Sequence, residues 1–254
     1  MSDKHPLSGT TVIFTGTPKA KEAVASVQLQ GGNPVIYPLI KTVEKMVPTD
    51  SLRMQTCASY EWLIFTSANA VHYFGRKMEQ VGLTTSDIPV KVAAVGSETA
   101  KALEDVGFKA DFVPSTFSAE HFVEEFPAVS DEEERCLFLK GDLAKDTIKE
   151  GLPNEVDEWT VYETVDDEEG IRGVKDLLKK GGRIAVLFAS PSAVRVFSEQ
   201  IAAETGWTGF TIGAIGHVTE EALLEAGAAV HVKPERYTLL DLVRELGNRK
   251  EGMS

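Results

Sequence analysis

The feature that most constrains the fold is a stretch of sequence that occurs twice in the chain. Residues 93–114 read AAVGSETAKALEDVGFKADFVP, and residues 213–234 read GAIGHVTEEALLEAGAAVHVKP. An alanine, a glycine, a threonine, an Ala-Leu pair, a second glycine and a final proline recur in register. A repeat of this length indicates that one supersecondary unit is present twice. Since 254 residues suffice for two ordinary domains, we expect two domains built on one plan.

The sequence before each copy of the repeat is also matched. Residues 61–79 (EWLIFTSANAVHYFGRKME) precede the first copy, and residues 182–202 (GRIAVLFASPSAVRVFSEQIA) precede the second, so that Ser67 corresponds to Ser190. In both, a short β-rich run is followed by an amphipathic helical pattern. Strands that alternate with helices predict a parallel sheet covered by helices.

Two further segments of the chain show a weaker sequence similarity to each other. Residues 11–24 (TVIFTGTPKAKEAV) resemble residues 135–148 (RCLFLKGDLAKDTI), and both are followed by extended segments, at 33–44 and 155–166. The chain therefore contains two short blocks, residues 11–44 and 135–166, and two long blocks, residues 61–114 and 182–234. Short and long blocks alternate along the sequence. One short and one long block together make a five-stranded domain, so the predicted fold class is α/β, with two flavodoxin-like doubly wound parallel-sheet domains.

Two arrangements of these blocks are possible. In the tandem order each short block joins the long block that follows it, whereas in the exchanged order the N-terminal block completes the C-terminal domain. The extended, glycine-free segments YPLIKTVE and WTVYETVD favour exchange, because they suit two crossings between lobes with a ligand-binding cleft between them. The predicted boundaries are these: 1–37 with 168–254 for domain 1, 44–160 for domain 2, and 38–43 with 161–167 for the linker strands.

Composition excludes several classes of partner. The formal net charge of −13 argues against binding to nucleic acid or to an anionic membrane. No apolar run approaches the roughly 20 residues of a membrane helix, and the first residues lack the features of a signal peptide, so a cytoplasmic location is expected. Cys57 and Cys136 are far apart and lack metal-type spacing, which predicts reduced thiols near the core and no metal site.

Three pairs of small, hydroxyl-rich loops follow predicted strands, at the sheet edge where open α/β folds bind ligands. They are FTSANA with FASPSA, VGSETA with IGHVTE, and FTGTPK with FLKGDL. Small residues let backbone N–H groups approach an anionic ligand, so that even an acidic protein can bind one. Ser67, Ser97 and Ser190 could instead be helix N-caps, and Gly96 and Gly216 could be turn residues only.

The usual catalytic signatures are missing from the sequence. It contains no P-loop, no GxGxxG and no GxSxG, and its five histidines form no metal-binding pattern. This indicates a binding module or a reaction that needs little beyond shape and a weak acid. Tyr162, in the expected linker segment WTVYETV, is the candidate acid, since a phenol donates a hydrogen bond. The alternative is that Tyr162 is only a good strand former.

The motifs LIFTSANAV, VAAVGSETAKALEDVGF, VPSTFSAEHF, LFLKGD, WTVYETV, LFASPSAVRVF and IGAIGHVTEEALLEAG together resemble the uroporphyrinogen-III synthase family over nearly the whole chain. The resemblance implies two flavodoxin-like lobes on a two-stranded linker. It also implies a substrate, hydroxymethylbilane, which is a linear tetrapyrrole with eight carboxylates, and a product, uroporphyrinogen III, formed with loss of water. No metal or organic cofactor is implied, and a monomer is expected. The alternative is a non-catalytic two-lobe protein that binds or senses tetrapyrroles or small anions.

The resemblance also implies roles for individual residues. Tyr162 matches the family tyrosine that assists loss of water, and Thr99 and Thr219 match two threonines at helix starts. We expect Tyr162 and Thr219 to be catalytic. The expected substrate contacts are Ser67, Ala68, Asn69, Gly96, Ser97, Thr99, Lys140, Gly141, Ser190, Pro191, Ser192, Gly216 and His217.

Overall fold

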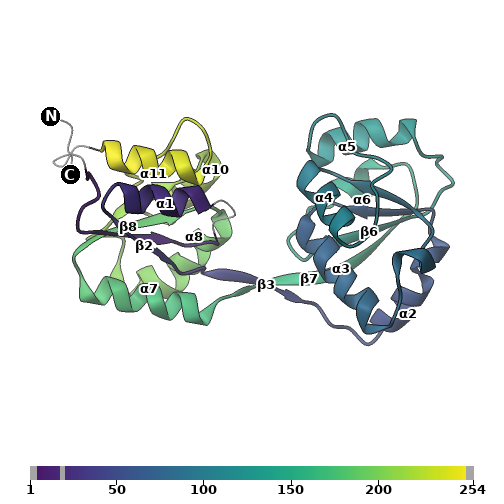
Figure 1. The fold of residues 1–254 in the computed structure, drawn as a ribbon, viewed down its shortest axis with the longest axis horizontal. Coiled ribbons are helices and arrows are strands. Elements are labelled where there is room, and N and C mark those ends of the chain that lie inside the picture. Colours follow the sequence, from purple (N-terminus) through teal and green to yellow (C-terminus); the bar gives the residue numbers. More distant parts are fainter. Residues whose placement is uncertain (1–4, 18–20, 250–254) are drawn as a thin grey trace. The chain divides into compact units, whose positions relative to one another are not determined.

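The chain forms two compact units in a computed structural model that describes residues 5–17 and 21–249 (Figure 1). One unit consists of residues 1–41 and 165–254, and the other of residues 42–164. The first is called unit 1 and the second unit 2. Unit 2 is therefore continuous in sequence, whereas unit 1 is assembled from both ends of the chain.

Unit 1 is built on a parallel sheet with the strand order β2-β1-β8-β9. The strands are β1 (Thr10–Phe14), β2 (Asn33–Ile36), β8 (Arg183–Phe188) and β9 (Thr211–Ala214). An isolated parallel bridge between Gly213 and Val232 continues the sheet beyond β9. This is the strand order of the flavodoxin type, as predicted. The helices of unit 1 are α1 (Lys21–Leu29), α7 (Glu168–Lys180), α8 (Pro191–Phe197), α9 (Ala203–Thr205), α10 (His217–Glu225) and α11 (Leu239–Asn248), with a π-helical turn at Ser198–Ala202 between α8 and α9.

Side chains of unit 1 alternate between the two faces of the sheet, which gives two cores. On one face, Phe14 and Leu187 pack with residues of α1 and α11, the two helices that lie side by side in Figure 1. On the other face, Ile13, Val186 and Phe188 pack with residues of α7, α8 and α10. Because successive residues of a strand point to opposite faces, a continuous apolar run such as IAVLF fills both cores.

Unit 2 contains a five-stranded sheet with the order β3-β7-β6-β4-β5. Its strands are β3 (Ile40–Glu44), β4 (Trp62–Phe65), β5 (Lys91–Ala94), β6 (Cys136–Gly141) and β7 (Val156–Asp166). The pairs β7-β6, β6-β4 and β4-β5 are parallel. The boundaries between the two units fall within β3 and β7, and β7 begins at Val156, before the start of the linker strand predicted at 161–167. The helices are α2 (Asp50–Thr56), α3 (Ala68–Gln80), α4 (Ser97–Asp105), α5 (Ala119–Glu125) and α6 (Thr147–Gly151), with 3-10 turns at Cys57–Ser59, Thr85–Asp87 and Phe126–Ala128.

The two sheets have the same arrangement of short-block and long-block strands, but the chain forms these strands in a different order in each unit. In unit 1 the short block β1-β2 precedes the long block β8-β9, whereas in unit 2 the long block β4-β5 precedes the short block β6-β7. In both sheets the first strand of the short block lies beside the first strand of the long block. The two topologies are therefore circular permutations of each other.

The last strand expected of the long block in unit 2 is reduced to a single bridge between Ala93 and Phe112. The Asp111 carboxylate accepts a hydrogen bond from the Val92 N–H at 2.8 Å, so a side chain occupies a donor that a longer ladder would use. Pro114 has no backbone N–H to extend the pairing. The five strands expected from the short and long blocks of unit 2 are thus four strands and one bridge.

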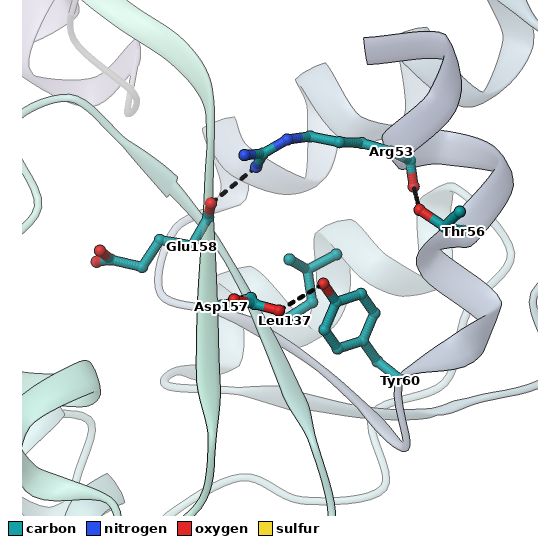
Figure 2. A pocket seen from close by; sticks show the side chains of 6 residues that line it. All are labelled: Arg53, Thr56, Tyr60, Leu137, Asp157 and Glu158. Carbon is teal, nitrogen blue, oxygen red and sulfur yellow. Dashed lines mark hydrogen bonds between the residues drawn. The ribbon is translucent and has the colours of Figure 1, made fainter. Parts of the chain in front are cut away.

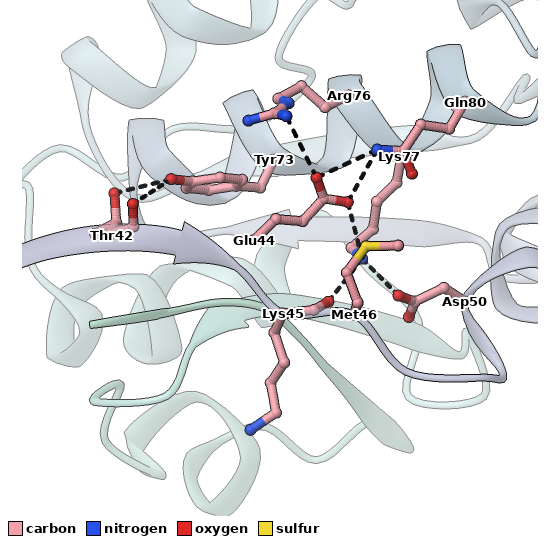
Figure 3. A network of polar contacts seen from close by, with 9 residues as sticks. All are labelled: Thr42, Glu44, Lys45, Met46, Asp50, Tyr73, Arg76, Lys77 and Gln80. Atoms are coloured by element: carbon pink, nitrogen blue, oxygen red, sulfur yellow. Dashed lines mark hydrogen bonds and ion pairs between the residues drawn. The ribbon is translucent and has the colours of Figure 1, made fainter. Parts of the chain in front are cut away.

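A buried lysine joins three elements of unit 2 (Figure 3). Lys77 of α3 is 2% exposed, and its ammonium group contacts Asp50 at 2.6 Å, Glu44 at 3.2 Å and the Lys45 carbonyl at 2.7 Å. Trp159 of β7 donates to the other Asp50 oxygen at 3.0 Å. Burial raises the pKa of Asp50, but hydrogen bonds from Lys77, Val47 and Trp159 lower it by more, so that the pKa lies below its usual value. This cluster fixes β3 and α2 against α3 and β7.

Both cysteines are free and buried, as predicted. Burial raises the pKa of Cys57 to about 11 and, together with nearby Glu134 and Glu61, that of Cys136 to about 12. Neither thiol is therefore an activated nucleophile. Among the described residues, no helix is long and apolar enough to cross a membrane, and no group of three His, Cys, Asp or Glu side chains could hold a metal ion.

Candidate active site

Tyr162 of β7 is held in a fixed position at the carboxyl edge of the unit 2 sheet. Its backbone pairs with Gly141 of β6, and a side-chain methyl group at Gly141 would overlap the Tyr162 ring. Tyr73 of α3 stacks on the Tyr162 ring, with ring centroids 5.6 Å apart and planes 24° apart. The Tyr73 hydroxyl in turn donates to the Thr42 carbonyl at 2.6 Å. The phenol of Tyr162 is thus supported by Gly141 and by Tyr73.

The hydroxyl of Tyr162 lies 3.2 Å from the Ser67 Oγ. Ser67 is the N-cap of α3, and its Oγ accepts a hydrogen bond from the Ala70 N–H at 3.1 Å. The capping interpretation of Ser67 is therefore confirmed, and it does not conflict with a role in the site. A serine that accepts from the helix keeps its own O–H proton, which it can direct to the Tyr162 oxygen or to a ligand. Asn69 is exposed in the first turn of the same helix, next to Ala68.

Ser190 occupies the corresponding position in unit 1. Its Oγ accepts from the Ala193 N–H at 3.3 Å, and Pro191 and Ser192 form the first turn of α8. Ser190 is therefore also a helix N-cap, as the alternative interpretation held. By the internal repeat, Tyr162 corresponds to Ile40 of β3, so the matching position carries no phenol.

The starts of α4 and α10 carry the other predicted contacts. Gly96 and Gly216 are the N-cap residues in extended conformation, with φ of −154° and −169°. Ser97 and His217, the first residues of the two helices, are exposed. Thr99 and Thr219 are buried, at 4% and 3% exposure. The exposed polar side chains at these helix starts are thus Ser97, Glu98 and His217, and the burial of the threonines indicates a packing role.

Lys140 does not offer a free cation to a ligand. The side chain is buried, and its ammonium group lies 2.7 Å from Glu158 and 3.5 Å from Asp146. Lys149 contacts the second Glu158 oxygen at 2.9 Å. Burial raises the pKa of Glu158, but the two lysines lower it by more, so the carboxylate stays charged. The charge of Lys140 is used within the chain, which argues against the predicted contact between this side chain and a substrate carboxylate.

Unit 2 has a pocket that Glu158, the partner of Lys140, lines together with residues near the other ends of the strands (Figure 2). Leu137 and Asp157 in its wall are near the starts of β6 and β7, at the amino edge of the sheet. The Tyr60 hydroxyl donates to Asp157 at 2.8 Å, and Arg53 donates to the Glu158 carbonyl at 2.8 Å. Because these polar groups already pair with one another, and because open α/β sheets bind ligands at the other edge, this pocket is not the candidate site.

Comparison with known proteins decides the family. A family model described as uroporphyrinogen-III synthase HemD matches residues 21–244. The chain belongs to the uroporphyrinogen-III synthase family. This confirms the resemblance drawn from the motifs, and the matched range includes every residue predicted for the site.

Individual members of the uroporphyrinogen-III synthase family match most of the chain. The uroporphyrinogen-III synthase of Synechococcus elongatus is 29% identical, over 93% of this chain and 94% of that protein. The Chlorobaculum parvum enzyme is 28% identical over 89% of this chain and 94% of that protein. A porphyrin biosynthesis protein HemD of Ruminiclostridium josui is 28% identical over 96% of this chain but only 49% of that longer protein.

Solved structures from the uroporphyrinogen-III synthase family share the fold. The Helicobacter pylori protein has a TM-score of 0.62 at 17% identity, with 94% of this chain and 98% of that chain covered. A mutant of the Thermus thermophilus protein has a TM-score of 0.61 at 18% identity over the same shares. The predicted α/β fold class is confirmed.

The sequence indicated Tyr162, Ser67 and Gly141 as site residues. It did not indicate which side chains hold the Tyr162 ring in place. Tyr73 was missed, since nothing in a helical pattern separates a tyrosine that stacks on another tyrosine from one that fills the core. Gly141 was expected to contact substrate, and the structure shows in addition that it makes room for the Tyr162 ring, which the sequence did not indicate.

Proposed function

We propose that this chain is a uroporphyrinogen-III synthase, which cyclises hydroxymethylbilane with inversion of ring D and loss of water. The observation that carries the proposal is the Tyr162 hydroxyl, fixed beside the Ser67 Oγ at the ligand-binding edge of a sheet in a member of this family. The family makes a tetrapyrrole precursor of heme. The reaction requires no redox step, which suits a site without activated thiols.

We propose that Tyr162 assists departure of the hydroxyl group on ring A. In the scheme that the family implies, electrons from the pyrrole nitrogen of ring A expel this hydroxyl and give an azafulvene, and the phenol donates a hydrogen bond to the leaving oxygen. The substituted carbon of ring D then attacks to form a spiro-pyrrolenine, and fragmentation and reclosure leave ring D inverted. Water carries away the hydroxyl and one proton, so product and water together balance the substrate.

The carboxylate arms of the substrate need donors, and the net charge of −13 means that lysine clusters do not supply them. We propose that backbone N–H groups at the starts of α3, α4 and α10 bind the arms, together with the exposed side chains of Asn69, Ser97 and His217. Thr219 would then act by fixing the first turn of α10, because its side chain is buried. The protein's main contribution is to hold a flexible bilane in the conformation that leads to the spiro route.

The test is the isomer that forms from freshly prepared hydroxymethylbilane. Left alone, the bilane closes to uroporphyrinogen I, so after oxidation the ratio of uroporphyrin isomers III and I measures catalysis. We expect isomer III to dominate. Only isomer I, formed at the rate seen without protein, would contradict the proposal and favour a non-catalytic tetrapyrrole or anion sensor.

We further propose that the protein works as a cytoplasmic monomer without a metal or organic cofactor. A single chain already contains both copies of the repeated fold, so no second chain is needed to supply one. Light scattering on a size-exclusion column should give a mass near 27.6 kDa. Dialysis against a chelator should leave the rate of isomer III formation unchanged.

A further inference from the structure

Two aromatic side chains stand out by their exposure. All phenylalanines, tyrosines and tryptophans lie within the described residues, and only Phe117, at 60%, and Tyr237, at 53%, are exposed. The rest are buried in the cores or partly covered. A single exposed apolar side chain is common on protein surfaces, so exposure alone does not assign these rings a role, and their positions in the fold have to be compared.

Phe117 and Tyr237 occupy equivalent positions of the two repeats. They are 120 residues apart, as are Gly96 and Gly216 and the other matched positions of the repeated stretch. Phe117 follows the first copy of that stretch by three residues, and Tyr237 follows the second copy by three. The repeat therefore places one exposed aromatic ring at the same point of each unit.

The backbone presents both rings in the same way. The N–H of Ser118 donates to the Thr116 carbonyl at 2.8 Å, and the N–H of Thr238 donates to the Arg236 carbonyl at 2.7 Å. Each aromatic residue is therefore the central residue of a three-residue turn. The residue after each ring then caps a helix: the Ser118 Oγ accepts from the His121 N–H and the Thr238 Oγ from the Asp241 N–H.

Each ring lies against the glycine that begins the repeated helix. A side chain at Gly96 would meet the Phe117 Cβ at 3.5 Å, and one at Gly216 would meet the Tyr237 ring at 2.8 Å. In unit 1 the His217 ring is also close, with its centroid 5.5 Å from that of Tyr237. Both exposed rings thus lie at the carboxyl edge of their sheets, beside Ser97 in one unit and His217 in the other.

We propose that Phe117 in unit 2 and Tyr237 in unit 1 are substrate-positioning residues, and that in each unit the exposed ring is a surface on which a pyrrole ring of a tetrapyrrole packs. The inference rests on the proposed function, which supplies a ligand made of flat, electron-rich rings with carboxylate arms. Aromatic rings pack face to edge or in offset stacks with such rings. Carboxylate arms of the same pyrrole would then lie next to the donors at the starts of α4 and α10. The presence of Phe in one unit and Tyr in the other assigns the task to the ring and not to the hydroxyl.

The experiment compares variants that remove the flat ring with variants that keep it. Phe117→Leu and Tyr237→Leu retain apolar bulk, and each should raise KM for hydroxymethylbilane about fivefold, with a larger share of isomer I at low substrate. Phe117→Tyr and Tyr237→Phe should behave like the wild type. Leu29→Ala serves as the control for loss of exposed apolar surface, since Leu29 is 78% exposed at the end of α1, at the opposite edge of its sheet.

A second measurement separates this inference from the proposed function. Affinity for uroporphyrin III, the stable oxidised form of the proposed product, is measured by quenching of tryptophan fluorescence and does not require turnover. Wild-type protein that makes only isomer I would overturn the proposed function, while weaker binding by the two leucine variants would still support the rings as a binding site. Leucine variants with wild-type KM, isomer ratio and affinity, at an unchanged unfolding temperature, would overturn the inference.

Discussion

At the scale of single residues, the site depends on the support of one phenol. The Tyr162 ring lies over Gly141 of the neighbouring strand and stacks on the Tyr73 ring, and its oxygen lies beside the Ser67 Oγ. The sequence was sufficient to select Tyr162 as a candidate, because the motif WTVYETV that contains it is a local feature. It was not sufficient to find Tyr73, since stacking between a helix and a strand depends on their packing in three dimensions.

Removal of the phenol oxygen should affect turnover more than binding. Tyr162→Phe keeps the ring volume and the stack on Tyr73 but removes the donor, so we expect kcat to fall about a hundredfold with KM nearly unchanged. Initial rates of isomer III formation at several substrate concentrations give both values. A kcat within about twofold of the wild type would contradict a catalytic role and favour the alternative that Tyr162 is only a good strand former.

A methyl group at Gly141 should act through the same phenol. Gly141→Ala would displace the Tyr162 ring that now occupies the space above the glycine, and kcat should fall by a similar factor. The double variant Gly141→Ala, Tyr162→Phe should lose little more than Tyr162→Phe alone, because the two changes remove one interaction. Multiplication of the two losses would instead show that Gly141 serves the site independently of Tyr162.

At the scale of elements, regular strands and helices were predictable where apolar periodicity was strong, and poorly predictable where a few side chains decide. The helix α2 has a single buried residue, Met54, and no helix was predicted there. The structure fixes it through Asp50, which Lys77 and Trp159 both contact. Such contacts join residues far apart in the chain, so no window of sequence contains them.

The buried ammonium group should matter for stability far more than its exposed neighbour. Lys77→Met leaves Asp50 and Glu44 without their buried cation and should lower the free energy of unfolding by about 3 kcal/mol. Arg76→Met, on the same helix, removes an exposed guanidinium 3.8 Å from Glu44 and should cost no more than about 0.5 kcal/mol. Urea titrations followed by tryptophan fluorescence provide the comparison, and equal losses in the two variants would contradict the role given to Lys77.

The same cluster predicts a dependence of stability on acid. The pKa of Asp50 is lower in the folded chain than its usual value of 3.8, so its contribution is complete above that value and is lost as the pH falls through the folded pKa. Asp50→Asn should therefore be less stable than the wild type at pH 7, and the gap should narrow below about pH 4. Unfolding temperatures between pH 7 and pH 3 test this, and a gap that stays constant would exclude Asp50 as the titrating group.

At the scale of the whole molecule, most of the fold could be predicted from the internal repeat. Matched short and long blocks predicted two sheets of one type, and the structure shows the two units as circular permutations. Which loops bind which arms of a substrate was beyond prediction, since Ser67, Ser190 and the two turn glycines have structural tasks as well. A repeat preserves structural and functional residues alike, so matching positions does not separate the two.

Net charge predicts the response of the enzyme to salt. A protein of formal charge −13 and a substrate with eight carboxylates repel each other at long range, and salt screens this repulsion. We expect kcat/KM to rise about two- to threefold between about 0.01 M and 0.15 M salt, as the Debye length falls from ~30 to ~8 Å. The rate of closure without protein, measured at the same salt concentrations, is the control. A steady fall of kcat/KM with salt would show that cationic side chains dominate binding.

The permuted connectivity also sets the order in which the molecule can be completed on the ribosome. Unit 2 needs only residues 42–164, so its sheet can close while the last third of the chain is still being made. Strand β1 must wait for β8, because Thr10 pairs with Arg183. β1 and β2 can pair with each other early, but the other edge of β1 stays unpaired until all of unit 2 and then β8 have been made.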